Sequence, residues 1–267
     1  MPFTPIHAVA MIPVGAVWPR PVPTSALVIG SVVPDWPLYL PVGPAYATTH
    51  SLVGVLGFCV PVGFALFLLF QFLLKRPLFE LLPAYFRQRL WRFVQAPWVF
   101  RFHTLVGVVI ALALGSMVHV AWDSFTHKGQ WGVENVDALR NVLFVVADVE
   151  VHVYKLLQHG STAVGGLVLL LFLVFWFRGR LPESIPASRL VAWQRTTAIG
   201  ALILIPLLFG GLSALEVLAG GINYIAFRQA LFDAITQTVF VFLMMVCGYC
   251  VLFRLISPSS RALDISL

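Results

Sequence analysis

Five long runs of apolar residues dominate the chain, and shorter polar segments separate them. The runs cover about residues 52–74, 104–121, 162–177, 198–218 and 234–255. A helix that crosses a bilayer needs roughly 20 mostly apolar residues, so this pattern predicts five membrane-spanning helices. Two shorter helices are expected before the first run, because Thr4-Pro5 and Thr24-Ser25 are typical helix starts. A further helix is expected from about Asp137 to Gln158.

The composition places the chain in the membrane class. Hydrophobic residues make up 60% and charged residues 10%, and the mean hydropathy is +0.92. Globular chains are roughly 25% charged. We therefore expect an all-α integral membrane bundle that forms a single domain over 1–267. Residues 1–160 carry the polar motifs and residues 161–267 supply the C-terminal spans. Three Cys predict no disulfide framework, and the proline-rich N-terminus without a basic start predicts no cleavable signal peptide.

The basic residues are distributed unevenly between the two ends of these spans. The segments 75–103 and 178–195 and the chain from 254 onwards hold most of the seventeen Lys and Arg. The positive-inside rule places these segments in the cytoplasm. The net charge of +6 is therefore a topology signal and implies no nucleic acid partner. We expect a multi-pass protein of the bacterial inner membrane, with membrane lipids as its partners.

The end of the second run carries His119, Asp123 and His127 at spacings of four. On a helix His119 and Asp123 share a face, which suits two ligands of one metal. His127 would lie roughly 12 Å along the axis from His119. Either the helix breaks near Ser124 or His127 serves a second metal. The alternative to a metal site is that these polar residues have no functional role and lie at the end of an interfacial helix.

The predicted orientation brings three earlier residues to the same, extracytoplasmic, face: His7, Asp35 and His50. Mixed imidazole and carboxylate ligands suit zinc, and manganese or iron are the alternatives. One or two ions are expected, with Asp123 as the bridge if there are two. Asp35 is a ligand, a catalytic general base or a turn residue. The candidate metal ligands are His7, Asp35, His50, His119, Asp123 and His127.

A second set of polar residues follows in the helix expected over 137–158. Asp148, His152, Lys155 and His159 are spaced by four, three and four, which predicts one polar stripe on a helix. The stripe faces either water or the metal cluster. In the second case His152, Lys155 and His159 are candidate substrate contacts or extra ligands.

Several of these motifs resemble an uncharacterised bacterial membrane family, the domain of unknown function 4184. They are Met-Pro-Phe-Thr-Pro-Ile-His7, Gly30-Ser-Val-Val-Pro-Asp35, Thr49-His50-Ser51, His119-Val-Ala-Trp-Asp123-Ser-Phe-Thr-His127 and Tyr154-Lys-Leu-Leu-Gln158-His-Gly-Ser161. The resemblance runs through about the first three fifths of the chain. That family has no established activity, so the resemblance implies a membrane protein and no particular chemistry.

The order of the polar residues also resembles the bacterial membrane-bound metal-dependent hydrolases, and through them zinc phospholipase C and the zinc-dependent single-strand nucleases. In that group an early His, an Asp, a His and a His-x-x-x-Asp followed by a further His bind zinc. The group ends its cluster with His-x-x-x-Glu, whereas here His152 is followed at that spacing by Leu156. The group also binds metal through the free N-terminal amine that signal cleavage leaves, and no such ligand is expected here because no cleavable signal peptide is predicted. The resemblance therefore implies one or two metals and not three.

Three functions fit these observations. The first is a zinc-dependent hydrolase of a phosphoester or lipid head group, since the cluster is expected at head-group depth. The second is a non-catalytic metal- or lipid-binding membrane protein. The third is a transporter with the cluster as a cation site, which would require ionisable residues near the middle of several spans.

Overall fold

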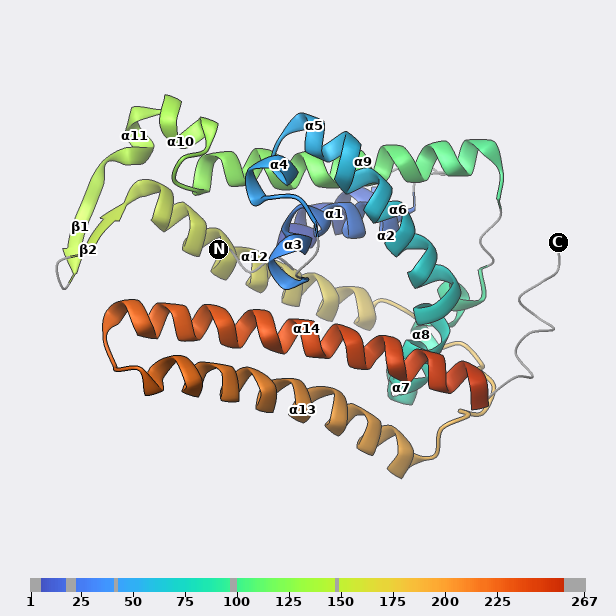
Figure 1. Cartoon of the computed structure of the whole chain (residues 1–267). Helices are drawn as coiled ribbons and strands as arrows, with labels where there is room; N and C mark the ends of the chain where they lie inside the picture. The colour runs from blue at the N-terminus through green and yellow to red at the C-terminus, as the bar shows by residue number, and fades with distance from the viewer. Residues whose placement is uncertain (1–5, 18–22, 41–42, 97–99, 147–148, 257–267) are drawn as a thin grey trace. The chain divides into compact units, whose positions relative to one another are not determined.

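The computed structural model describes residues 6–17, 23–40, 43–96, 100–146 and 149–256. It is almost entirely helical, as the apolar pattern predicts, and it also contains one short hairpin (Figure 1). Five of its helical stretches are long and apolar enough to cross a membrane, which confirms a multi-pass membrane protein. They are Leu52–Leu81, Phe102–Thr126, Val153–Arg178, Ala192–Ala219 and Tyr224–Ile256.

The first span is longer than expected and continues through the basic pair Lys75-Arg76. It consists of α5 (Leu52–Gly54), α6 (Val60–Leu69) and α7 (Lys75–Leu81), joined by π-helical turns at Val55–Cys59 and Phe70–Leu74. The side chain of Ser51 caps its start by accepting a hydrogen bond from the Gly54 N–H at 3.0 Å. This cap holds His50 immediately before the span.

The chain divides into two compact units. The first consists of Met1–Pro37, Val42–Phe67 and Val99–Gly179, and the second of Leu38–Pro41, Leu68–Trp98 and Arg180–Leu267. The expectation of a single membrane domain stays a prediction.

The second unit contains the end of the first span, α8 (Ala84–Gln95), and the antiparallel pair α13 (Ala192–Ala219) and α14 (Tyr224–Ile256). Glu80 of α7 is buried there. Its Oε2 accepts hydrogen bonds from Arg87 Nη1 at 3.2 Å and Ser188 Oγ at 3.1 Å. A buried carboxylate needs such partners, and these tie α8 and the segment before α13 to the first span.

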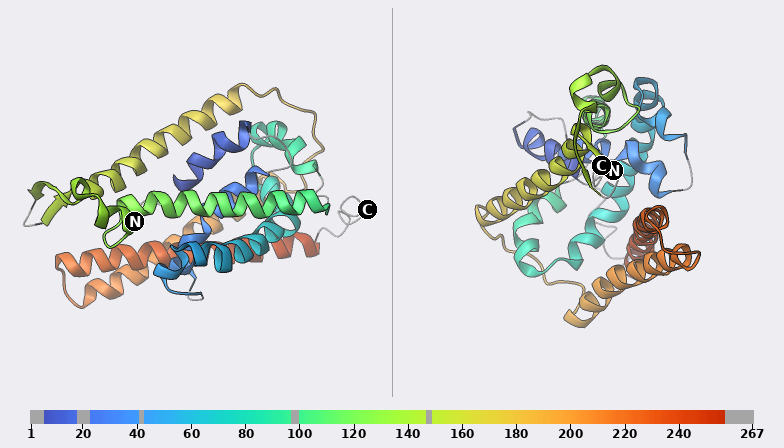
Figure 2. Two further views of the ribbon diagram at one scale, coloured as in Figure 1. Left: turned by 90° about the horizontal axis from the view of Figure 1, so that it is seen from above. Right: turned by 90° about the vertical axis from the view of Figure 1, so that its left-hand side faces the viewer.

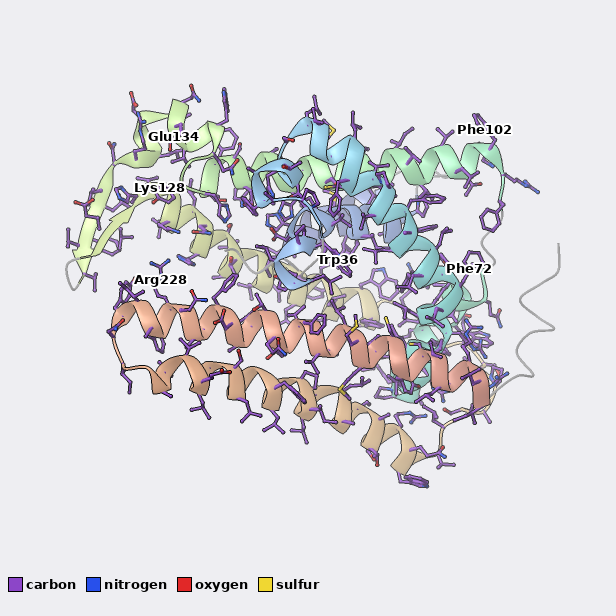
Figure 3. All side chains as sticks on the ribbon, in the orientation of Figure 1. Trp36, Phe72, Phe102, Lys128, Glu134 and Arg228 are labelled. Atoms are coloured by element: carbon purple, nitrogen blue, oxygen red, sulfur yellow. The ribbon has the colours of Figure 1, made fainter. Side chains whose placement is uncertain are left out.

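The first unit is built around α9 (Phe102–Thr126), which runs from Phe102 to the connector that contains Lys128 and Glu134 (Figure 3). Two short helices, α1 (His7–Val17) and α2 (Thr24–Gly30), pack against it. Gly30 touches the backbone of Leu112, and Gly115 touches the backbone of Leu27, so α2 lies against the middle of the span. Small residues permit such close approach of helices in membranes. The pair α1–α2 therefore packs along α9, with His7 at its start and Ser31 just after its end both beside His119.

Three short elements lead from α2 to the first span: a 3₁₀ turn at Val33–Asp35, α3 (Trp36–Tyr39) and α4 (Tyr46–Thr49). The 3₁₀ turn presents Asp35 just after α2. The expected helix start at Thr4-Pro5 lies outside the described residues.

The prediction of one helix over 137–158 is wrong. The segment instead forms α11 (Asp137–Arg140), an antiparallel hairpin of β1 (Val142–Val146) and β2 (Val149–His152), and the start of α12 (Val153–Arg178). Helix α10 (Trp131–Asn135) precedes them. The many Val residues of 142–151 explain the difference, because β-branched side chains favour strands and lose rotamer freedom in helices.

Candidate metal centre

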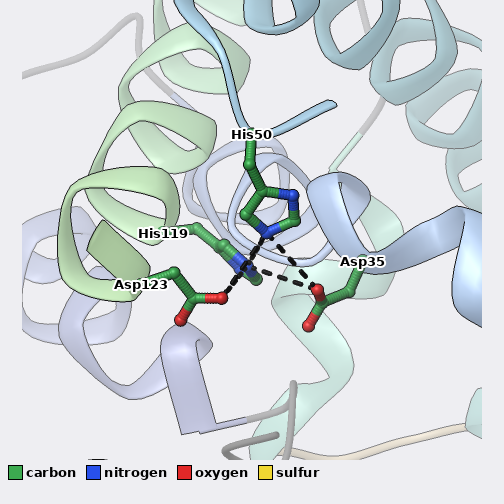
Figure 4. A group of neighbouring side chains, drawn as sticks. All are labelled: Asp35, His50, His119 and Asp123. Atoms are coloured by element: carbon green, nitrogen blue, oxygen red, sulfur yellow. Dashed lines mark hydrogen bonds and ion pairs between the residues drawn. The ribbon is translucent and has the colours of Figure 1, made fainter. Parts of the chain in front are cut away.

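Four polar side chains meet near the C-terminal end of α9, and all four are buried (Figure 4). Asp35 comes from the 3₁₀ turn after α2, His50 from the C-cap of α4, and His119 and Asp123 from one face of α9. One ligand atom from each lies within 4.8 Å of all the others. The sequence expectation that these elements converge is therefore a structural fact, while the metal itself stays a prediction.

The atoms that face one another are the two Nε2 nitrogens and one oxygen of each carboxylate. The nitrogens of His50 and His119 are 3.3 Å apart. Each lies 3.6 Å from Asp35 Oδ1 and 3.5 Å from Asp123 Oδ2. Ligands about 2.0–2.2 Å from a tetrahedral ion lie roughly 3.3–3.6 Å from each other. These five separations fit one ion of zinc-like size, and the two carboxylate oxygens lie within 4.8 Å of each other.

Backbone carbonyls set the tautomers of both rings. His119 Nδ1 lies 2.7 Å from the Ser31 carbonyl oxygen, and His50 Nδ1 lies 3.1 Å from that of Tyr46. A carbonyl only accepts, so both Nδ1 atoms carry the proton and donate it. In the neutral rings both Nε2 atoms then present lone pairs to the centre. This is the arrangement typical of metal-binding histidines.

Small residues of α2 and α9 hold His119 at this place. Ser116 Oγ donates to the Gly30 carbonyl at 2.9 Å, one turn from His119 on α9. The next carbonyl along α2, that of Ser31, accepts from His119 itself. The close packing of α2 on α9 therefore fixes the orientation of the ring.

His7 lies beside the four residues and is buried. Its ring stacks on that of His119 with centroids 3.9 Å apart. Its Nε2 lies 3.4 Å from Asp123 Oδ1, and neither atom has a hydrogen-bond partner among the described residues. Burial, and next the neighbouring His119, lower the pKa of His7 from 6.5 to about 4. His7 is therefore neutral near pH 7.

His127 is also present, although the helix does not break near Ser124. Helix α9 continues to Thr126, and His127 has extended backbone angles that turn its ring back. Its Nδ1 lies 3.4 Å from Asp123 Oδ2. Burial lowers its pKa, against the opposite influence of Asp123.

The other ring nitrogen of His127 is occupied by Gln158. The Lys155 ammonium donates to Gln158 Oε1 at 2.8 Å, which fixes the orientation of that amide. Gln158 Nε2 then donates to His127 Nε2 at 2.8 Å. The proton of His127 is therefore on Nδ1, which lies 3.2 Å from Thr126 Oγ1 and 3.4 Å from Asp123 Oδ2.

Two residues of this site were missed by the sequence reasoning, Tyr46 and Gln158. Tyr46 donates its hydroxyl to Asp123 Oδ2 at 3.0 Å, and its ring stacks on His50 at 3.7 Å. Burial, and then the Asp123 and Asp35 carboxylates, raise the pKa of Tyr46 far above its usual value, so the hydroxyl stays a donor. Tyr46 precedes His50 by four residues, and this helical spacing could have indicated from the sequence that the two side chains lie together. Gln158 is completely buried on α12.

The stripe expected from Asp148 to His159 does not exist as a helical face. Asp148 lies outside the described residues. His152 ends β2, and its Nδ1 donates to the Arg140 carbonyl at 2.8 Å. His159 is exposed. Of His152, Lys155 and His159, the three members that the structure describes, only Lys155 reaches the cluster, and it does so through Gln158.

The family model described as a domain of unknown function, DUF4184, matches residues 1–256. The chain belongs to this family. No curated protein and no solved structure matches the chain. The family assignment therefore carries no activity, and the function has to be argued from the site.

Proposed function

We propose that this membrane protein binds a divalent metal ion at Asp35, His50, His119 and Asp123. One observation carries the proposal: two ring nitrogens with lone pairs and two carboxylate oxygens face one another in a buried site. Two imidazole lone pairs and two carboxylate oxygens at these distances repel one another, and a shared cation or proton removes this cost. The five separations that involve a ring nitrogen match a tetrahedral ion, which favours a metal, and mixed nitrogen and oxygen ligands favour zinc.

We further propose that the site hydrolyses a phosphoester, in the first place of a lipid head group. A divalent ion supplies Lewis-acid polarisation of a phosphoryl oxygen and acidifies water. The depth supports a lipid substrate, because Asp123 is only three residues from the end of α9, or about 4.5 Å along its axis. A transporter site near the middle of the bilayer fits this position less well.

Polar groups beyond the four ligands support a catalytic role. Asp123 uses one oxygen for the four-residue centre and turns the other toward His7, so it can bridge to a second ion. Tyr46 holds the first oxygen by a hydrogen bond. Lys155 and Gln158 orient His127 so that Nδ1, between Thr126 Oγ1 and Asp123 Oδ2, carries its proton. We assign His127 the role of holding that proton and Asp35 the role of a ligand.

A second candidate function, a non-catalytic metal site, has its own support. Structural zinc sites are closed by four protein ligands, whereas catalytic sites keep an open position. The four residues here form a complete set and are buried. A turnover assay separates the two candidates, and metal analysis alone does not.

The first experiment is elemental analysis of the purified protein, with His119→Ala as the test variant and His103→Ala as the matched control. His103 is exposed in the first turn of the same helix. We expect zinc in the wild type and in His103→Ala, and its loss from His119→Ala. Phosphodiester and phospholipid substrates are then screened with zinc and manganese. Metal without turnover favours the non-catalytic site, and absence of metal from the wild type refutes both candidates.

We also propose the inner membrane of a bacterium as the location, with the cluster at the extracytoplasmic face. The support is the concentration of Lys and Arg near the opposite ends of the spans.

A further inference from the structure

The hairpin β1–β2 exposes apolar side chains to an unusual degree. All five residues of β1 are exposed, and they are Val142, Leu143, Phe144, Val145 and Val146. Phe144 is 49% and Val146 58% exposed. An exposed apolar surface of this kind marks contact with a membrane or a partner.

The two faces of the hairpin differ in chemistry. Phe144 lies opposite Val151, and Val146 follows two residues later on the same face. Val145 lies opposite Glu150 on the other face, and the Glu150 side chain is 62% exposed. One face is therefore apolar, whereas the other carries a charge that requires water. This amphipathic pattern is typical of elements that lie in a membrane interface.

The position of the hairpin supports the same environment. It lies beyond the ends of α9 and α12 (Figures 1 and 2), and β2 ends at His152 immediately before α12 begins. None of the most apolar 18-residue window of α12 is buried inside the protein, as expected of a span that lipid covers. Trp131 of the adjoining α10 is 68% exposed, and exposed Trp is enriched at membrane interfaces. The apolar face thus continues a lipid-facing surface.

We propose that β1–β2 is an interfacial anchor whose apolar face, Phe144, Val146 and Val151, inserts into the lipid bilayer at the cluster end of the spans. The occupant of the face is lipid and not a second copy of the chain, because the face adjoins a lipid-facing span. The anchor sets the depth of the site: Gln158 follows Val153 by five residues, about 7.5 Å of helix, and bonds to His127. The proposal does not depend on metal binding.

The test compares labels on the two faces. Phe144→Cys and Val145→Cys are made in the full chain, labelled with an environment-sensitive fluorophore and reconstituted into phosphatidylcholine vesicles. Quenching is measured with aqueous iodide and with a lipid that carries a nitroxide high on its acyl chain. We expect the label at 144 to respond severalfold more to the lipid quencher, and the label at 145 to respond more to iodide.

Two controls keep the test decisive. Labelled wild-type chain gives the background from the native cysteines, of which Cys59 and Cys250 are buried. Val146→Cys repeats the apolar-face measurement at an exposed position. Equal iodide quenching at 144 and 145 would place the hairpin in water. Protection at 144 that disappears when the protein is diluted with lipid would show that a second copy covers the face. Either result overturns the proposal.

Discussion

Removal of the Tyr46 hydroxyl tests the geometry of the centre without removal of a ligand. Tyr46→Phe deletes one hydrogen bond to Asp123 Oδ2 and keeps the ring that stacks on His50. A bond to a charged group contributes about 1.5–3 kcal/mol, and 1.4 kcal/mol corresponds to a factor of ten. Loss of a partner that orients a ligand costs roughly 10–100-fold in metal affinity.

The structure favours the lower end of the roughly 10–100-fold loss of metal affinity. The O–H···O distance is 3.0 Å, whereas the strongest bonds of this kind are about 2.5–2.7 Å. His127 Nδ1, at 3.4 Å from the same oxygen, can take over part of the role. We therefore expect Tyr46→Phe to weaken zinc binding by about tenfold. Asp123→Asn, which removes a ligand charge, should weaken it by more than the Tyr46 change.

The assay is a competition titration against a fluorescent zinc chelator in nanodiscs. Tyr154→Phe serves as the matched control, because Tyr154 is a buried tyrosine of the same unit that lies outside the four-residue centre. Unchanged affinity in Tyr46→Phe would refute the role of the hydroxyl. Unchanged affinity in Asp123→Asn would refute the centre itself.

Three further predictions concern packing, pH and topology. Gly115→Ala should lower thermal stability and zinc affinity together, because a Cβ there would meet the α2 backbone at 2.3 Å, whereas Gly57→Ala, with open space, should change neither in the same chelator titration. The metal-free protein should lose roughly 3 kcal/mol of stability as the pH falls from 6.5 to about 4, because His7 binds a proton in the unfolded chain but stays neutral when buried. Above pH 6.5 this contribution to stability is constant. Thermal unfolding measured over a pH series should show this dependence in the wild type and lose it in His7→Gln. A reporter fused at Pro186 should be cytoplasmic and a cysteine label at Gly129 should be reached from outside; the reverse result would place the cluster at the cytoplasmic face.

The sequence by itself determined the membrane class and the core of the site. Apolar runs long enough to cross a bilayer predict spans without knowledge of their neighbours, because the bilayer sets their length. The shared face of His119 and Asp123 likewise follows from helix periodicity alone. Local patterns of this kind are readable because each depends only on residues a few positions apart.

The tertiary structure decided everything that depends on contacts between distant segments. Only the packing of α2 on α9 shows that a backbone carbonyl of Ser31 orients His119. Only the approach of α12 to α9 reveals that Gln158 holds His127 and that the stripe from Asp148 to His159 is not one face. Residue spacing predicts a helix where the structure forms β1 and β2, because the β-branched side chains of this segment favour strands. Backbone partners and buried neutral residues leave no periodic trace in the sequence, so the completion of the site had to come from the fold.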